Sequence, residues 1–563
     1  MIKKYLKVII LFSFILFSTC SWENEYKAAA RRSLQPDTDL ILVPYPHNIF
    51  DKEARESITL SHYSQDELKE ILIEHEISWE ELKNTWGWDE NLKQFEKEVN
   101  YTSHYTHYPY DTNIPIWIYG PKWIKPGTYP DSIFQQHIPS IYAKILNFDF
   151  KNKIDIKDYN KIFTKNTTKP ELIVTIVVDQ GGDQLYKAHP NSSPFLTSLK
   201  SSSAYFTKAK VAHLEAHTAV GHAAIGTGSF PKEMGTFSNE VYYYNNGSVN
   251  ERKAYETLDK KINLNEMKTL SFADEWDRKN KNLPVVVSQC YAARASIGMA
   301  GHGSLIPEQI SNENLPDQDF VYWENTNTLR WDTYTKAYSL PETLNNLDLY
   351  QFYIEKNKVS NSEFKVKDRI DLIKKMHHFQ ASEYQVLLDG ETFRTVVNNE
   401  IISKPFFNDG VTDLAFVTLK ATDAVGHLYG WESKESENIL RATDMEIRKI
   451  FDFLRSNYED KFLLVVTADH GAAPMPEVSN ASFLTHQKFF EYMGELLPKE
   501  ARKDKTVVKW ITHSHMNLNR EVMSEFNISE KDIIQKLKKL TINNKPFFRR
   551  IWTRSDIESN SIF

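Results

Sequence analysis

The sequence is poor in cysteine: its 563 residues include only Cys20 and Cys290. Cys20 directly follows a segment that resembles an export signal. If Cys20 is acylated during export, Cys290 has no intramolecular partner. A disulfide framework is therefore excluded as the source of stability. Hydrophobic residues make up 41% of the chain, which is enough to bury the core of one large domain with an inserted cap, or of two domains.

Positive charge is also scarce. The chain has 68 lysines and arginines against 75 acidic residues, which gives a net charge of −7 and an isoelectric point near 6.2. A groove that binds nucleic acid through gross charge needs the opposite balance. We therefore expect no nucleic-acid groove. Internal repeats and low-complexity tracts are absent from the sequence as well.

The sequence also contains few long apolar runs. The run Val8–Phe17 follows three lysines and is too short to remain in a bilayer as a spanning helix. The small residues before Cys20 resemble a loose bacterial lipoprotein cleavage box, so the sequence predicts a signal peptide over 1–19, a lipid on Cys20 and a polar tether over 20–37. An ordinary cleaved signal or an uncleaved anchor are the alternatives. If Cys20 carries the lipid, the protein is exported to the periplasm or cell surface and is held at the membrane by that lipid.

What the sequence does contain is three short apolar runs, rich in β-branched residues, that each end at an acidic residue. They are Leu172–Val178 before Asp179, Leu414–Leu419 before Asp423, and Phe462–Val466 before Asp469. Such runs are typical of buried parallel strands. Open α/β sheets place their ligand sites at the carboxyl ends of these strands. The pattern predicts an α/β fold with a site at that edge.

Histidines accompany these carboxylates. Asp423 and His427 are separated by three residues, His470 follows Asp469, and Asp179 stands alone after its strand. Each pattern by itself is also typical of a turn or a helix cap. Together they offer oxygen and nitrogen ligands that suit Zn²⁺, with Mn²⁺, Fe or Mg²⁺ as less suitable occupants.

Two cations about 4 Å apart can clamp the attacking and leaving oxygens of a phosphoryl displacement. Such a site needs a nucleophile between the metals. Thr218 is the candidate, because it lies in small-residue surroundings at the start of a predicted helix. There, metal coordination would lower the pKa of its hydroxyl and the helix N-terminus would favour an anionic phosphoryl group. The alternative is that Thr218 is an ordinary N-cap.

Three motifs resemble those of the alkaline phosphatase superfamily, in the branch with a threonine nucleophile: type I phosphodiesterase/nucleotide pyrophosphatases and related alkaline phosphatases. The motifs are Thr218-x-x-Gly221-His222, Thr422-Asp423-x-x-Gly426-His427 and Ala468-Asp469-His470-Gly471. The resemblance implies a mainly parallel central sheet flanked by helices, with an inserted cap. It also implies hydrolysis of phosphate mono- or diesters through a phosphothreonine at Thr218.

The resemblance further implies which residues hold two zinc ions. One ion would be held by Asp179, Thr218, Asp469 and His470, and the other by Asp423 and His427. Asn239 matches the family's contact to a phosphoryl oxygen. Arg294 matches the arginine of the monoesterase branch's Lys-x-Arg pair. The lysine of that pair is replaced by Ala292, which should weaken the stabilisation of a dianionic monoester more than that of a diester.

The family's last segment, which supplies the third ligand of the second zinc, is not found after Asp469. Residues 103–127 resemble it in order, from Ser103-His104 through Tyr110-Asp111-Thr112 to Lys125-Pro126-Gly127. We therefore predict a circular permutation with His104 as that ligand. His107, His513 and His515 are rival candidates. Chain ends that lie close together at the surface would permit such a rearrangement.

The predicted organisation is a permuted core segment over 38–165 with a helical excursion at 51–100, core over 166–239, an inserted cap over 240–405, and core over 406–563. The main prediction is a zinc-dependent phosphoric ester hydrolase. A sulfatase is disfavoured because position 218 is not Cys or Ser. The alternative from another class is a surface lipoprotein that keeps the fold, lacks catalysis and binds a partner. The sequence leaves the leaving group and the oligomeric state open.

Overall fold

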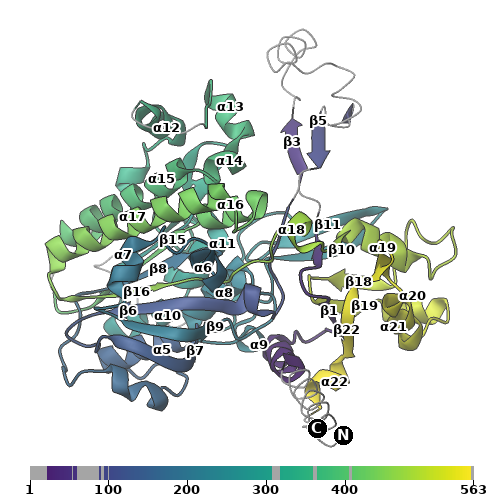
Figure 1. Ribbon diagram of the computed structural model, residues 1–563, viewed down its shortest axis with the longest axis horizontal. Coiled ribbons are helices and arrows are strands. Elements are labelled where there is room, and N and C mark those ends of the chain that lie inside the picture. The colour runs from purple at the N-terminus through teal and green to yellow at the C-terminus, as the bar shows by residue number, and fades with distance from the viewer. Residues whose placement is uncertain are drawn as a thin grey trace, which may run out of the picture.

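The structure is a computed structural model (Figure 1). It describes residues 22–52, 55–59, 88–89, 94–98, 101–306, 318–358, 364–404 and 409–559. The predicted signal peptide, Cys20 and most of the predicted helical excursion at 51–100 lie outside these ranges. Within the described ranges, no helix combines the length and the apolarity that crossing a membrane requires.

A nine-stranded sheet forms the centre of the molecule. Its order is β14 (Arg330–Asp332), β13 (Asp319–Asn325), β12 (Val286–Gln289), β15 (Asp413–Leu419), β8 (Leu172–Val178), β16 (Phe462–Thr467), β6 (Asn113–Tyr119), β9 (Ala204–Lys210) and β7 (Gly127–Phe134). The strands β13, β12, β15, β8 and β16 are mutually parallel, and β9 is parallel to β7, whereas β6 is antiparallel to both of its neighbours. The predicted α/β fold with a mainly parallel sheet is confirmed.

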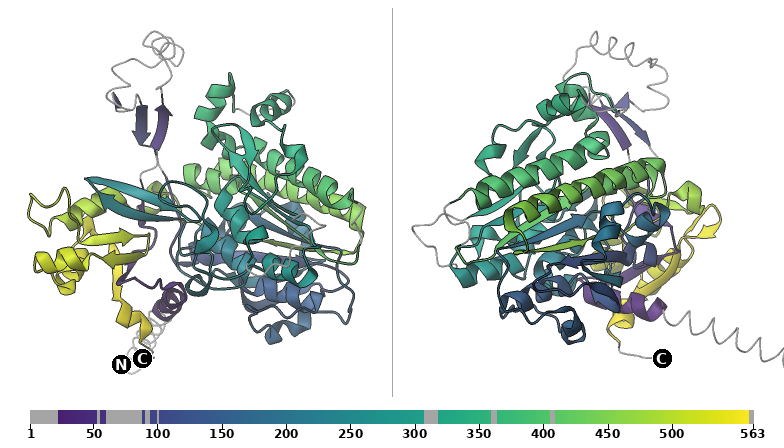
Figure 2. Two further views of the ribbon diagram at one scale, coloured as in Figure 1. Left: turned by 180° about the vertical axis from the view of Figure 1, so that it is seen from behind. Right: turned by 60° about the vertical axis from the view of Figure 1, so that its left-hand side comes forward.

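Successive residues of the central strands enter two different cores, because neighbouring side chains of a strand point to opposite faces. Ile173 and Val177 join one core, while Val174 and Ile176 join the other. The first core is covered by α5 (His137–Leu146), α8 (Thr218–Thr227), α10 (Phe272–Asn280) and α11 (Ala293–Ala300). The second is covered by α7 (Pro194–Leu199), α15 (Glu383–Val396) and α17 (Lys434–Tyr458). Figures 1 and 2 show these helices on the two sides of the sheet.

A second, antiparallel sheet stands beside the central one (Figure 1). Its order is β11 (Ser248–Lys253), β10 (Glu240–Asn245), β18 (Val508–Ile511), β19 (His515–Leu518), β1 (Leu40–Pro44) and β22 (Phe548–Thr553). The N-terminal strand β1 thus lies between two C-terminal strands. In the C-terminal region, α20 (Arg520–Glu525), α21 (Glu530–Lys538) and α22 (Arg554–Glu558) accompany β18, β19 and β22, together with the short strands β20 (Thr541–Ile542) and β21 (Lys545–Pro546).

Two N-terminal expectations differ from the structure. Within the predicted tether, residues 22–33 are helical and bury Tyr26, Ala29 and Ala30. The polar composition hid this apolar face, because the charged residues Glu23, Glu25, Lys27, Arg31 and Arg32 surround the buried ones. At the predicted helical excursion, the described parts are strands: β3 (Arg55–Thr59), β4 (Trp88–Asp89) and β5 (Gln94–Glu98) form a small antiparallel sheet.

The interval 240–405 is not a uniform cap. It contributes β12, β13 and β14 to the central sheet and packs α10 and α11 on one face. The cap-like part is helical: α12 (Leu349–Asn357), α13 (Arg369–Lys374) and α14 (Met376–Gln380) lie with α15 over the other face. The interval predicted as an inserted cap therefore also contains core strands. Because β12 has only four residues, no long apolar run marks it as one.

Candidate active site

The candidate site lies where three parallel central strands end. Asp179 follows β8, Asp469 follows β16, and Asp423 lies in the first turn of α16 (Ala421–Tyr429), which begins directly after β15. Because the strands are parallel and adjacent, their carboxyl ends meet at one edge of the sheet. All three carboxylates are buried. The predicted position of the site is therefore the one that the fold creates.

One set of atoms, which we call the first ligand group, consists of Asp179 Oδ1, Asp469 Oδ2 and His470 Nε2. The imidazole nitrogen lies 3.1 Å from Asp469 Oδ2 and 3.5 Å from Asp179 Oδ1. Nδ1 of the same ring donates to the carbonyl of Gly471 at 2.9 Å, so its Nε2 lone pair faces the carboxylates. All three atoms are buried and have no hydrogen-bond partner.

The second ligand group consists of Asp423 Oδ1 with Nε2 of His427 and Nε2 of His104. The two nitrogens lie 3.2 and 3.4 Å from the carboxylate oxygen. Each ring donates from Nδ1 to a backbone carbonyl, of Thr102 for His427 at 2.6 Å and of Ala216 for His104 at 2.7 Å. These bonds aim both Nε2 atoms at Asp423. The ring of His104 also stacks on that of His470, with 3.5 Å between centroids, so the two groups adjoin.

The rival histidines lie elsewhere. His107 has its Nδ1 3.3 Å from the carbonyl of His213 and packs its ring against Tyr26. His513 and His515 both have Nδ1 within 3.5 Å of the carboxylate of Glu215. Of the four candidates for a third ligand beside Asp423 and His427, the structure brings only His104 to that position.

Thr218 is the first residue of α8, and His217 is the N-cap; the alternative that Thr218 is itself the N-cap is wrong. The side chain of Thr218 is buried at the positive end of the helix. Asn239 lies beside it, because its Oδ1 accepts the N–H of Ala219 at 2.8 Å. A Cβ on Gly221 would lie 2.8 Å from Cβ of Asp469, so the motif glycine is what lets the helix approach the first ligand group.

Lys420 is a residue of the site that sequence reasoning missed. Its buried ammonium lies 2.6 Å from Asp179 Oδ2, 2.7 Å from Asp423 Oδ2 and 3.1 Å from Thr218 Oγ1. It therefore contacts one oxygen of each of two carboxylates and leaves the other oxygen to a ligand group. The available signal was a lysine ending a buried strand, where a charge has no packing role.

The electrostatics of the site are dominated by negative charge. Burial raises the pKa of Asp179 well above its usual value, and the nearby Asp469 carboxylate adds to the effect. Burial acts in the same direction on Asp423, but Lys420 and His427 hold the pKa of Asp423 well below its usual range. Burial lowers the pKa of His104 to about 3, which keeps that imidazole neutral, the form that binds metals.

Arg294 is near enough to respond to this charge. Burial alone would lower the pKa of its guanidinium, but Glu240, Asp423 and Asp179 raise it. Its Nε is buried without a hydrogen-bond partner. The side chain thus has a donor available for an anionic ligand.

The two ligand groups fit divalent metals. In a tetrahedral zinc site with bonds of about 2.0–2.1 Å, ligand atoms lie roughly 3.3–3.4 Å apart, and the separations to His470 Nε2 and to Asp423 Oδ1 are 3.1–3.5 Å. The buried ligand atoms of the first group have no partners, and such atoms beside several carboxylates are costly unless a cation is present. The donor set of carboxylate oxygens and imidazole nitrogens is one that zinc accepts.

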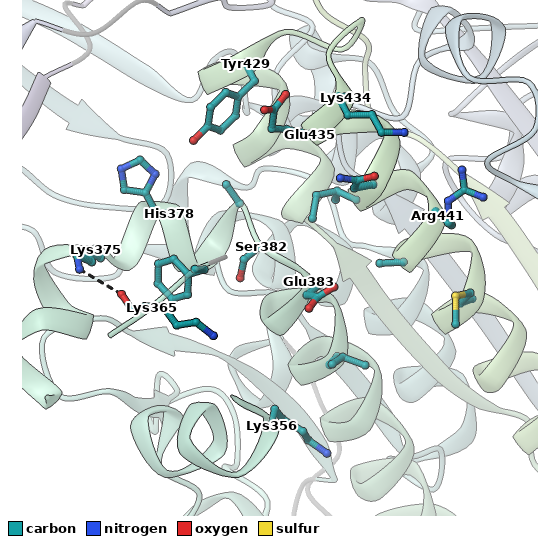
Figure 3. Close-up of a pocket in the computed structure, with 17 residues that line it drawn as sticks. Lys356, Lys365, Lys375, His378, Ser382, Glu383, Tyr429, Lys434, Glu435 and Arg441 are labelled. Atoms are coloured by element: carbon teal, nitrogen blue, oxygen red, sulfur yellow. Dashed lines mark hydrogen bonds between the residues drawn. The ribbon is translucent and has the colours of Figure 1, made fainter. Parts of the chain in front are cut away.

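A large cavity is separate from these groups. It has a volume of about 1310 Å³ and lies between α14–α15 on one side and α16–α17 on the other (Figure 3). Tyr429, at the end of α16, is part of its lining, but no member of either ligand group is. Three of its lysines are already paired, Lys356 with Glu391 at 2.6 Å, Lys375 with Asp371 at 3.0 Å and Lys434 with Glu437 at 2.7 Å. The cavity adjoins the helix that carries Asp423 but is not the candidate site.

Comparison with known proteins identifies the family. The model of the type I phosphodiesterase/nucleotide pyrophosphatase family matches residues 172–561, more than half of the chain. The chain belongs to this family. The matched range includes Asp179, Asp423, His427 and Asp469, whereas His104 lies ahead of it.

The chain is also similar to individual known proteins. Alkaline phosphatase PhoD of Zymomonas mobilis is 25% identical over 329 residues, which cover 54% of this chain and 54% of that protein. A protein of Myroides odoratus named calcium-transporting ATPase is 24% identical over 414 residues, covering 65% and 72%. The crystal structure of wild-type alkaline phosphatase PafA aligns with a TM-score of 0.48 and 17% identity, covering 69% and 85%. The chain thus spans about half the length of the first of these relatives.

Proposed function

We propose that the protein is a metal-dependent phosphoric ester hydrolase in which Thr218 is the nucleophile. The observation that carries this proposal is the position of the Thr218 hydroxyl: it lies at a helix N-terminus, 3.1 Å from the Lys420 ammonium, which itself contacts a carboxylate of each ligand group. A hydroxyl in this setting is stabilised as an alkoxide. The relatives named as alkaline phosphatases support the same reaction class.

In this proposal Asp179, Asp469 and His470 hold one zinc ion together with Thr218, and Asp423, His427 and His104 hold the other. When bound, the metals would lower the pKa of the attacking hydroxyl and of water and would stabilise the charge on the leaving oxygen. Thr218 Oγ1 attacks phosphorus and forms a phosphothreonine, while the bond to the leaving oxygen breaks. Water then attacks the same phosphorus and releases phosphate, or a phosphomonoester, from Thr218.

In this proposal three side chains hold the non-bridging oxygens of the substrate. Asn239 is fixed at the start of α8 by its bond to the N–H of Ala219, and Arg294 has its partnerless Nε. Lys420 provides a further cation close to Thr218. We propose that it compensates for the lysine that Ala292 replaces, so that monoesters and diesters both remain substrates. Such preorganised donors lower the barrier because their orientation costs nothing during the reaction.

We also infer that the family's last segment has moved to the front of the chain. The support is that His104 and β6 come from the N-terminal region, yet β6 pairs with β16 and His104 contacts Asp423. In addition, β1 lies between C-terminal strands. We propose as well that the protein is exported and anchored by a lipid on Cys20; loss of labelled fatty acid in a Cys20→Ala variant, with unchanged synthesis, would test this.

The decisive experiment is hydrolysis of p-nitrophenyl phosphate, bis-p-nitrophenyl phosphate and the p-nitrophenyl ester of thymidine monophosphate by the purified, zinc-loaded protein. Thr218→Ala should lower kcat at least about 10³-fold, with metal content and thermal unfolding close to those of the wild type. Thr227→Ala, at the other end of α8, is the matched control and should keep turnover within a few-fold. Equal turnover by Thr218→Ala and the wild type would refute the role of Thr218.

The same preparation separates catalysis from the partner-binding alternative. A catalytically degenerate lipoprotein should turn over none of the three esters and should lack tightly held metal at the two ligand groups. We expect turnover of at least one ester, loss of turnover on chelation and its return with zinc. Absence of both turnover and bound metal would favour the alternative.

A further inference from the structure

A second histidine–carboxylate assembly lies where the two sheets meet. We call it the joint cluster and define it as Glu215, His217, Ser238 and His513. The first two belong to the segment that leads into α8, Ser238 precedes β10, and His513 lies between β18 and β19. All four are buried, with Glu215 at 0% exposure. None belongs to either ligand group of the candidate active site.

Glu215 Oε2 is the centre of this cluster. It lies 3.3 Å from His217 Nδ1, 3.5 Å from His513 Nδ1 and 3.2 Å from Ser238 Oγ. Ser238 Oγ and His217 Nδ1 are 3.2 Å apart. Ligand atoms around a tetrahedral zinc ion are separated by roughly 3.3–3.4 Å. The cluster therefore has the spacing of a metal site before any rearrangement.

The ring nitrogens present lone pairs to the middle of the cluster. His217 Nδ1 accepts from the backbone N–H of Asn239 at 3.5 Å, a long bond that a metal would replace. His513 Nδ1 is buried and has no hydrogen-bond partner, although Glu215 Oε2 is close to it. An orphaned imidazole nitrogen aimed at a carboxylate oxygen is the arrangement expected of a ligand pair without its ion.

Outer hydrogen bonds hold the carboxylate and one imidazole from behind. Glu215 Oε1 accepts from Thr512 Oγ1 and from the N–H of Ser514, both at 2.6 Å, which leaves Oε2 for the cluster. His513 Nε2 lies 3.1 Å from Asp51 Oδ1, at the end of β2 (Ile49–Asp51). A carboxylate behind a histidine fixes its tautomer and strengthens it as a ligand.

The backbone of Glu215 is also in an unfavourable conformation. Glu215 has a φ of 56°, in the left-handed region that glutamate rarely adopts. Strain of this kind persists where the surrounding structure over-determines it, which is common at binding sites. A φ in this region at Glu215 is consistent with a carboxylate that has been turned toward a fixed target.

We propose that the joint cluster is a third metal site, in which Glu215, His217 and His513 bind a zinc-like divalent cation with Ser238 or water completing the tetrahedron. Two imidazoles and few oxygens favour zinc over Mg²⁺ or Ca²⁺. His217 directly precedes Thr218 and Ser238 directly precedes Asn239. The ion would therefore tie both active-site residues to the smaller sheet, in a positioning role.

The competing explanation is a metal-free ion network in which protonated His513 is shared by Asp51 and Glu215. The two explanations make different demands on His217: a metal needs its Nδ1 as a ligand, whereas the network is complete without it. His217→Gln and His513→Gln should each remove the metal in the first case. In the second case neither variant changes the metal content.

The test is the number of zinc ions per chain, measured by mass spectrometry of the full, zinc-loaded protein after removal of free metal. We expect His217→Gln and His513→Gln each to hold one equivalent less than the wild type. His486→Gln is the control, because His486 stacks on Tyr242 beside the cluster but contributes no ligand; it should hold the wild-type amount. Circular dichroism establishes that each variant is folded.

The difference of one equivalent does not depend on the active site. If the two ligand groups bind two ions, the wild type should hold three zinc ions and each histidine variant two. If they bind none, the wild type should hold one and each histidine variant none. Cobalt gives an independent readout, since tetrahedral Co²⁺ absorbs strongly, and the absorbance should fall in His217→Gln but not in His486→Gln. Equal zinc counts in the wild type and in folded His217→Gln would overturn the proposal.

Discussion

The two histidine–carboxylate assemblies of this protein differ in how their atoms are satisfied. At the sheet edge, Asp179 Oδ1, Asp469 Oδ2 and His470 Nε2 are all buried without partners, and Lys420 bridges Asp179 and Asp423. In the joint cluster, His513 Nδ1 is the one ligand atom without a partner, and Glu215 and His513 are each anchored from behind by hydrogen bonds. Unsatisfied atoms beside a nucleophile suit a site that works on a substrate, whereas anchored ones suit a site that holds segments together.

The largest effect that would sharpen this contrast is expected from His104→Ala. Loss of one imidazole from the second ligand group should lower kcat/KM at least about 100-fold and remove about one zinc equivalent, because three ligands are reduced to two. His107→Ala is the matched control from the same loop and should stay within about twofold. Hydrolysis of p-nitrophenyl phosphate and zinc content measure both. Full activity of His104→Ala would exclude it as a ligand and remove the main support for the permutation.

The next largest effect is expected from Lys420→Met. This substitution removes the ammonium of the candidate active site, a group that has no counterpart in the joint cluster. We expect kcat to fall about 10- to 100-fold, with a larger fall for a monoester than for a diester, because a dianionic phosphoryl group needs the cation more. The measurement is the ratio of the two rates. Lys434→Met, on the exposed start of α17, should leave the ratio unchanged. A ratio that does not move in folded Lys420→Met would contradict a contact to the phosphoryl group.

Asp51→Asn should act mainly on the joint cluster. The asparagine keeps the shape but weakens the acceptor behind His513, so zinc affinity at that cluster should fall about 10- to 100-fold, while turnover changes only a few-fold. Competition with a chelator measures the affinity. Asp259→Asn, at an exposed carboxylate, serves as the comparison. A fall in turnover equal to that of His104→Ala would mean that the two assemblies are not separate.

A histidine–carboxylate pair outside both assemblies gives the smallest effect. His302 Nδ1 lies 2.8 Å from Asp274 Oδ2. Burial alone would lower the pKa of His302, but Asp274 more than offsets this, so that the pKa of His302 lies above its usual value. Its contribution to stability is thus complete below about pH 6.5 and is lost as the pH rises through the folded-state pKa. His302→Gln should cost about 1 kcal/mol at pH 5.5 and less at pH 8.5.

Urea unfolding of the wild type and of His302→Gln at both pH values measures this difference. The pair is the reference for an ordinary buried ion pair: zinc should not alter the effect of the substitution. A destabilisation that grows with pH would have the wrong sign for a raised histidine pKa.

Parts of the fold were predictable because their causes are local. The runs at 172–178, 414–419 and 462–466 are strands in the structure, at or within one residue of the predicted bounds. Their dense β-branched composition is enough to specify a buried strand. The four-residue β12 was not predictable, because a strand that short has no pattern of its own and is held by its neighbours β13 and β15. The helix at 22–33 was missed because charged residues surround its small buried face.

The sequence by itself determined the chemistry at the sheet edge, because an acidic residue directly after a buried parallel strand has only one edge to reach. Only the tertiary structure decided that His104 rather than His107 or His513 stands beside Asp423, that Lys420 bridges Asp179 and Asp423, and that Glu215 meets His513 at the joint between the sheets. Apart from Lys420 and Asp423, which are three residues apart, these residues are distant in the chain, and no local pattern encodes their distances. The central sheet gathers Asp179, Lys420 and Asp423 at one edge, the segment before β6 adds His104, and the turn between β18 and β19 brings His513 to Glu215, each within 3.5 Å of its partner.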